Sequence, residues 1–151
     1  MKKLLLIFGL LFISNSFSQS NNEIKTLDYA NIEIEVPNKC TAKSKYELLD
    51  CDGISVQWIH LDQEMLKSVP DQLIKQFSEN ATSKKPIEVI SFGATLKGYR
   101  FTYKNLENPN RIIVYGIVNK QPLILNVASE DELISISSLN KFLKKIMKLK
   151  A

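Results

Sequence analysis

The only histidine of the chain, His60, stands at alternating positions with two acids, Asp62 and Glu64. On a strand these three side chains would share a face, where they could supply ligands to zinc or calcium. His60 beside a carboxylate could also act as the base of a hydrolase. No second histidine and no cysteine cluster accompanies them. We therefore favour a strand end that turns polar before a helix, and we expect no metal site.

Serines and paired carboxylates give equally little support to catalysis. A nucleophilic serine needs a base and a third orienting group, and neither Ser55 nor Ser91 stands in a Gly-x-Ser-x-Gly elbow. Glu33 and Glu35 could form the carboxylate pair of a glycosidase, but they alternate with apolar residues and are typical of a solvated strand face. The sequence predicts no catalytic residue.

The glycines form no phosphate-binding loop. Gly93, Gly98 and Gly116 are isolated within strand-like runs, where a glycine marks a bulge or the close approach of two backbones. Asp52 and Gly53 are typical of a turn, and a calcium loop would need several further oxygen ligands. We expect no cofactor.

Residues 1–18 have the layout of a secretory signal peptide. Lys2 and Lys3 precede an unbroken apolar run over residues 4–13, and small residues follow at positions 16 and 18. The run is too short to span a bilayer, which needs about 20 apolar residues. We expect cleavage after Ser18 and a single mature domain over residues 19–151, secreted to a periplasm or beyond with no stable membrane anchor.

Export changes the meaning of the two cysteines, Cys40 and Cys51. In an oxidising compartment such a pair forms a disulfide, and the alternative is a pair of free thiols. A redox role is disfavoured because the pair lacks the Cys-x-x-Cys spacing that lowers a thiol pKa. The sequence predicts a structural bridge.

The charge of the chain does not indicate a nucleic-acid partner. The formal net charge is +4, of which Lys2 and Lys3 would leave with the signal peptide, and a balance this small is not typical of nucleic-acid binding. Arg100 and Arg111 are the only arginines, so planar, bidentate capture of carboxylates or phosphates has few possible agents.

One strand-like run carries two candidate recognition faces. Its residues alternate between aromatic and polar side chains: Tyr99, Phe101 and Tyr103 on one face, Arg100, Thr102 and Lys104 on the other. If a helix covers the aromatic face, that face is core; if it stays open, it is a ligand platform. We take Arg100 and Lys104 as candidate binding residues.

Period-two patterns predict most of the domain as strands. Residues 19–28 are expected to be frayed. The expected strands cover residues 32–36, a weaker segment within 40–49, 54–58, and four runs over 87–96, 98–104, 111–119 and 122–128. The short links between the last four favour an antiparallel meander.

Two amphipathic helices are expected against this sheet. Residues 68–80 carry an apolar stripe, with Ser68 as a cap and Pro70 in the first turn. A second, closing helix is expected to start at Ser129, where Glu132 would complete a capping box, and to bury a stripe including Leu139 and Leu143. The predicted fold is an α+β domain with an antiparallel sheet of five to seven strands and two main helices.

This order of elements resembles that of the Mog1/PsbP-like fold. It is carried by an extended segment ending at Pro37, a hairpin, a helix with Phe77, the meander with its run from Gly98 to Tyr103, and the closing helix. The resemblance covers nearly the whole mature chain and implies a non-catalytic binding or accessory module. It assigns no functional residue.

We therefore expect a non-enzymatic binding or accessory protein that engages another exported protein. An inhibitor or immunity-type protein that blocks an exported toxin or hydrolase is the first alternative. A hydrolase using His60 is the second.

Overall fold

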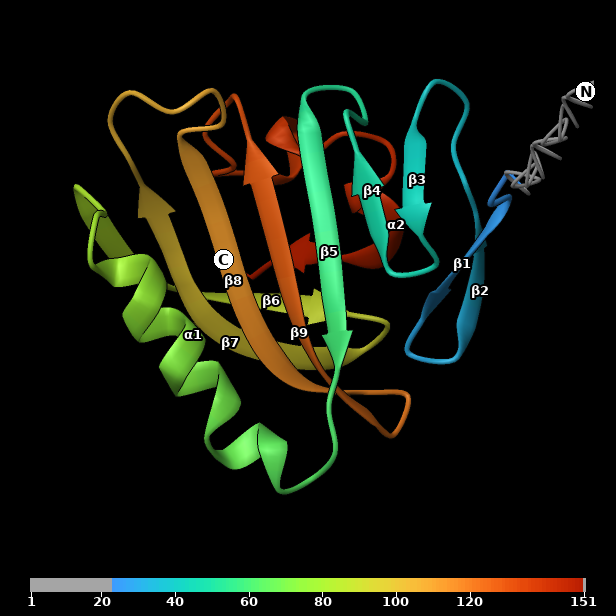
Figure 1. Ribbon diagram of the computed structural model, residues 1–151, viewed down its shortest axis with the longest axis horizontal. Helices are drawn as coiled ribbons and strands as arrows, with labels where there is room; N and C mark the ends of the chain where they lie inside the picture. Colours follow the sequence, from blue (N-terminus) through green and yellow to red (C-terminus); the bar gives the residue numbers. More distant parts are fainter. Residues whose placement is uncertain (1–22, 151) are drawn as a thin grey trace, which may run out of the picture.

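The computed structural model describes residues 23–150 (Figure 1). The expected signal peptide, residues 1–18, and the cleavage site after Ser18 lie outside the described residues. Within the described part, no helix is long and apolar enough to cross a bilayer.

Eight antiparallel strands form one sheet in the order β10-β6-β7-β8-β9-β5-β4-β3. These strands are β3 (Thr41–Ser44), β4 (Glu47–Leu49), β5 (Ile54–His60), β6 (Ser83–Ser91), β7 (Ala94–Thr102), β8 (Asn110–Val118), β9 (Gln121–Ser129) and β10 (Lys148–Leu149). Strands β6 to β9 follow one another as the expected antiparallel meander, which curves strongly in Figure 1.

A separate hairpin joins β1 (Thr26–Tyr29) to β2 (Ile32–Glu35). The expectation that residues 19–28 are frayed is wrong for β1, because Leu27 and Tyr29 are fully buried in the core. The alternation of buried and polar residues in β1 covers only four residues and is flanked by polar ones, so it is too short to predict a strand.

The expected α+β fold with two main helices is wrong. The described chain is 47% strand and 16% helical, and its sheet has eight strands where five to seven were expected. The one substantial helix is α1 (Val69–Ser78), which follows a 3-10 turn over Met65–Lys67. The region of the expected closing helix contains only a 3-10 turn over Ile136–Ser138 and the four-residue α2 (Leu143–Ile146), followed by β10.

Serine hydrogen bonds explain why the closing helix does not form. Ser129 does not cap a helix, because it is buried at the end of β9 and pairs with Ile54 and Asn110. Further on, the Ser138 hydroxyl donates to the Ser135 carbonyl at 2.6 Å and accepts from the Ser135 amide at 3.1 Å. These bonds form a capping box, in which Ser135 has extended backbone and starts a separate 3-10 turn, so a helix that begins at Ser129 cannot run through this position.

Helix α1 covers part of one face of the sheet (Figure 1). Ile74 of α1 is buried with Phe101 and Tyr103 in one cluster, and the Tyr103 hydroxyl donates to the Phe77 carbonyl at 2.7 Å. Phe101 and Tyr103 of the predicted aromatic face are therefore core, and Tyr99 is half-buried at the edge of the same cluster.

The opposite face of the sheet carries the larger core. The β1–β2 hairpin and the segment after β9 cover it, and Trp58 lies at its centre with an indole N–H that donates to the Asp28 carbonyl at 2.6 Å. Ser91 donates its hydroxyl proton to the Ile146 carbonyl at 2.6 Å, so Tyr29 is the donor in its 2.9 Å bond to Ser91. This chain of bonds ties the hairpin, β6 and α2 together.

Tyr29 is expected to make the fold sensitive to alkaline pH. Burial raises the pKa of its hydroxyl from 10.0 to about 12, against a smaller opposing effect of the bond to Ser91. The folded chain therefore holds the proton more tightly than the unfolded chain. Its contribution to the free energy of unfolding is complete below pH 10 and is lost, by about 2 to 3 kcal/mol in all, as the pH rises from 10 through 12.

Urea unfolding at several pH values across this window measures the effect. Tyr29→Phe should flatten the fall, and the part that remains should come from Tyr103 and Tyr115, whose pKa values burial also raises. An identical alkaline fall in Tyr29→Phe would contradict this assignment.

Candidate functional site

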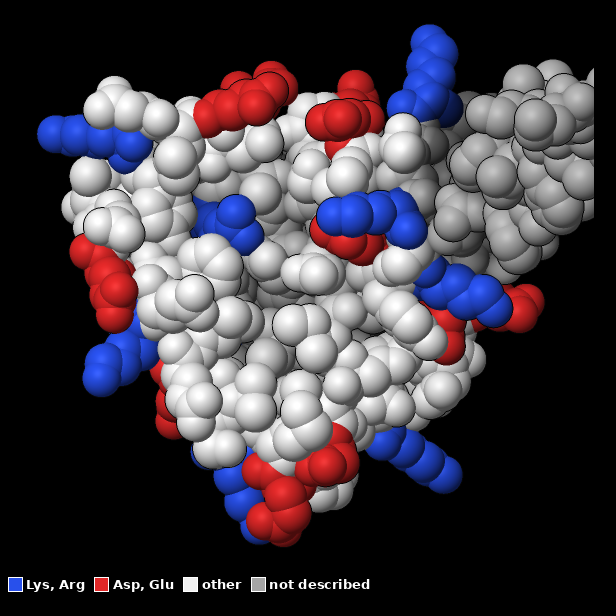
Figure 2. Space-filling model, in the orientation of Figure 1, with Lys and Arg blue, Asp and Glu red and all other residues white. Residues whose placement is uncertain are grey.

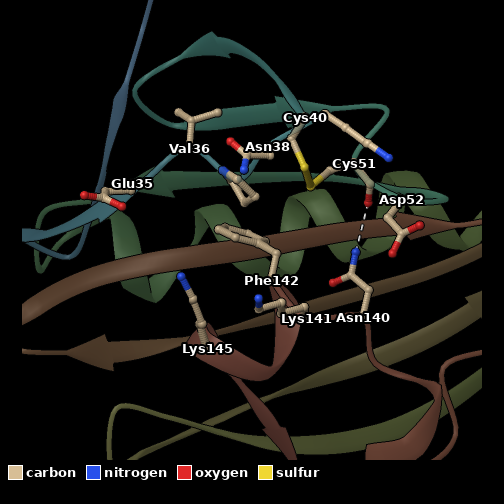
Figure 3. A pocket seen from close by; sticks show the side chains of 12 residues that line it. Glu35, Val36, Asn38, Cys40, Cys51, Asp52, Asn140, Lys141, Phe142 and Lys145 are labelled. Atoms are coloured by element: carbon tan, nitrogen blue, oxygen red, sulfur yellow. Dashed lines mark hydrogen bonds between the residues drawn. A yellow bond between two sulfur atoms is a disulfide. The ribbon is translucent and has the colours of Figure 1, made fainter.

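A cleft of about 710 Å³ opens beside the disulfide (Figure 3). Three segments line it: the connection from β2 to β3, the turn between β4 and β5, and the residues leading into and through α2. The lining residues are Glu35, Val36, Pro37, Asn38, Lys39, Cys40, Cys51, Asp52, Asn140, Lys141, Phe142 and Lys145. This volume lies within the range of ligand pockets, which is about 300 to 1,000 Å³.

The disulfide between Cys40 and Cys51 confirms the predicted bridge. It closes the open end of the β3–β4 hairpin and holds two walls of the cleft together. Asn140 attaches the third wall: its side-chain amide donates to the Cys51 carbonyl at 2.9 Å, and its oxygen accepts from the Leu143 amide at 2.8 Å. The cleft is therefore braced on all three sides.

Charges of both signs line the cleft around the disulfide and Phe142. Lys141 and Lys145 come from the α2 side, whereas Glu35 and Asp52 lie at opposite ends of the opening (Figure 3). None of these four side chains forms an ion pair with another described residue. Their charges are available to a ligand.

The cleft offers groups for binding more than groups for reaction. Its lining contains no histidine, serine, threonine or tyrosine, and both cysteines are in the disulfide. The two carboxylates lie apart (Figure 3). What the lining can do is form hydrogen bonds and ion pairs around the buried ring of Phe142.

His60 lies elsewhere and serves the fold. Its Nε2 accepts a hydrogen bond from the Ala30 amide at 3.2 Å, and its ring packs edge-on against Tyr46. The two acids predicted beside it are used locally: Asp62 accepts from the Met65 amide at 2.7 Å, and Glu64 pairs with Lys67 at 2.9 Å. In the described part of the chain, no three histidine, cysteine or acidic residues gather as a metal site.

The two predicted binding residues, Arg100 and Lys104, are not brought to the cleft. Arg100 contacts the segment after β9, where its Nη1 donates to the Leu133 carbonyl at 3.1 Å and its Nη2 lies 4.0 Å from Glu132. Lys104 is exposed just beyond β7. Of this pair, only Lys104 presents an uncommitted charge.

Sequence reasoning missed the residues that line the cleft. The sequence predicts a solvated helix face for Lys141 and Lys145, with a patch for an acidic partner or an anionic lipid as the alternative, and a solvated strand face for Glu35. The available signal was the disulfide, because a bridge between two turns brings their neighbouring side chains together.

The free edges of the sheet are poor binding sites for an added strand. The outer edge of β6 carries Lys84, Lys85 and Pro86, and β10 covers only its far end. The other edge, β3, has four residues and an irregular register with β4. Short strands, lysines, proline and bulges all oppose edge-to-edge pairing.

Comparison with known proteins found no matching family model, no similar curated protein and no similar solved structure. The Mog1/PsbP-like resemblance therefore stays a prediction.

Proposed function

We propose that the chain is an exported, non-enzymatic binding protein, and that the cleft beside the disulfide holds a segment of another exported protein. The disulfide is compatible with an extracellular or periplasmic location. The signal-peptide pattern of residues 1–18 gives independent support for export.

The observation that carries the proposal is a cleft whose charged side chains form no ion pairs and lie next to apolar ones. Three lysines and two acids surround the disulfide and Phe142. A polypeptide segment offers side chains of both charges next to apolar ones, and protein interfaces combine a polar rim with an apolar centre in the same way. The guarded edges of the sheet favour a partner that enters the cleft over one that extends the sheet.

Capture from the native exported fraction tests this proposal. The bait is the mature protein, residues 19–151, compared with the double variant Lys141→Glu/Lys145→Glu. Lys75→Glu/Lys120→Glu is the matched control, because it makes the same change in net charge at two exposed lysines outside the cleft. A captured protein should be retained by the native bait and by the control, and lost by the cleft variant.

Two outcomes would contradict the proposal. Equal capture by the cleft variant, with an unchanged melting temperature, would exclude the cleft. Loss of capture in Lys104→Glu alone would show that the partner binds at Lys104, as the sequence predicts, and not in the cleft.

An inhibitor or immunity-type protein is the second candidate, and an acidic group at another place in the fold favours it. Asp50, Glu107 and Glu130 line a small cavity of about 100 Å³. Such a group suits a basic toxin or hydrolase. In that case Glu107→Lys/Glu130→Lys should abolish a tight, stoichiometric complex that Lys141→Glu/Lys145→Glu leaves intact.

A further inference from the structure

Arg111 lies at the start of β8, on the face of the sheet that α1 partly covers. Its Nη1 donates to the side-chain oxygen of Asn126 at 2.7 Å. Its guanidinium carbon lies 4.6 Å from the centre of the Phe77 ring. The cation is thus held by a hydrogen bond to Asn126 and by its position over the Phe77 ring.

No acid balances this cation within the described residues. Arg111 is half-buried and belongs to none of the ion pairs of the described chain, whereas Arg100 has Glu132 at 4.0 Å. Burial lowers the pKa of the Arg111 guanidinium, which is the sign of an incompletely solvated charge. A partly desolvated charge is costly unless it is paired.

The residues that directly adjoin Arg111 on this face are uncharged. Ala128 is its neighbour on β9 and Ser55 follows on β5, while Gln57 stands beside Asn126 in the adjoining row. Acids lie further out: Glu47 on β4 follows Gln57, and Ser55 borders the small cavity lined by Asp50, Glu107 and Glu130. Figure 1 shows α1 to one side, with the front of β9 and β5 uncovered. Figure 2 shows few charged side chains over the middle of this face. Charged side chains are more frequent around its rim.

We propose that Arg111, oriented by Asn126 and Phe77, binds the carboxylate of a ligand that lies on the open face of β9 and β5. The only side-chain hydrogen bond of Arg111 in the described chain uses Nη1, which leaves the Nε and Nη2 donors for a planar, bidentate partner. Arginine pairs with carboxylates in this geometry, and its preorganisation reduces the entropy lost on binding. The site does not depend on the cleft beside the disulfide.

The test is a titration followed by NMR of the arginine Nε–H groups. The probes are sodium acetate, an N-acetylated dipeptide with a free carboxylate, and the same dipeptide as its amide, each at constant ionic strength set with sodium chloride. The resonance of Arg111 is assigned by its loss in Arg111→Lys. Saturable shifts at Arg111 and at the Asn126 amide are expected with the carboxylates and not with the amide.

Variants distinguish a built site from a general attraction. Arg111→Lys keeps the charge but loses the two parallel N–H donors of the guanidinium. It should weaken carboxylate binding by about tenfold or more, the scale expected when a bidentate pair is lost. Lys75→Gln removes an exposed charge and should leave the affinity unchanged. If Arg111→Lys does not fold, Asn126→Ala tests the orientation of the native arginine and should weaken binding several-fold.

The outcomes show whether Arg111 binds a carboxylate and whether that carboxylate belongs to a polypeptide or to a small molecule. Tighter binding of the dipeptide than of acetate supports a polypeptide carboxylate, and equal binding supports a small carboxylate. Equal shifts with chloride and acetate, or full affinity in folded Arg111→Lys, would overturn the proposal and leave Arg111 as a structural residue.

Discussion

Leu143→Ala is expected to lower the free energy of unfolding by about 2 to 5 kcal/mol, the cost of removing a large side chain from a packed core. Leu143 has no exposed surface and belongs to the main core with Phe142, Ile146 and Met147. The effect should be this large although α2 has only four residues, because packing and not helix formation stabilises this segment. Urea unfolding followed by tryptophan fluorescence measures it through Trp58.

Lys144→Ala is the matched control. Lys144 stands in the same short helix and is exposed, so its replacement should change the free energy of unfolding by no more than about 0.5 kcal/mol. If Leu143→Ala were as stable as Lys144→Ala but lost binding to liposomes, the segment would be a membrane anchor and its assignment to the core would be wrong.

The sequence predicts which residues of this segment are buried better than it predicts their backbone. Leu139, Leu143 and Ile146 are buried, as the apolar stripe indicated, whereas Ile136 of the same stripe is exposed. They reach the core by an irregular path, because the serines at 135 and 138 bond locally and Asn140 is held by Cys51. An apolar period alone therefore does not distinguish a helix from a loop whose side chains face a sheet.

Strands were predicted well where a turn bounds them clearly. The Asn119–Lys120 turn separates β8 from β9 close to the predicted limits. The expected run over 87–96 was wrong, because it crosses the turn at Phe92 and Gly93, where both residues have positive φ. A phenylalanine rarely adopts a positive φ, so the residue type at this position did not indicate a turn.

The candidate site was the least predictable part. Its walls come from Asn38, Asp52 and Lys141, and their proximity follows from the disulfide together with the path of the chain after β9. Alternation along one strand indicated Arg100, but its charge is held by the Leu133 carbonyl and Glu132. Arg111 is also an arginine on a strand, but it has no acidic partner in the described chain. Only the packing of the folded chain distinguishes the two arginines.

Gly98→Ala is expected to cost about 3 kcal/mol or more, because the added methyl group has no space and the atoms in its way belong to the backbone. A Cβ at Gly98 would collide with the Ile113 carbonyl oxygen and lie 2.8 Å from the Cα of Val114. The sequence indicated a bulge or a close backbone approach at this glycine, and the geometry is a close approach where β7 and β8 curve together (Figure 1).

Gly116→Ala supplies the control for this result, since it adds the same methyl group on the neighbouring strand. Its Cβ would lie 2.8 Å from Cδ2 of Leu96 and 3.3 Å from the Thr95 carbonyl oxygen. The nearer atom is the end of a side chain that can rotate away, so we expect a smaller loss, of about 1 to 2 kcal/mol. Denaturant unfolding of both variants measures the difference. Equal losses would show that the backbone at Gly98 moves as easily as the Leu96 side chain, and the curvature of the meander would then not require a glycine at that position.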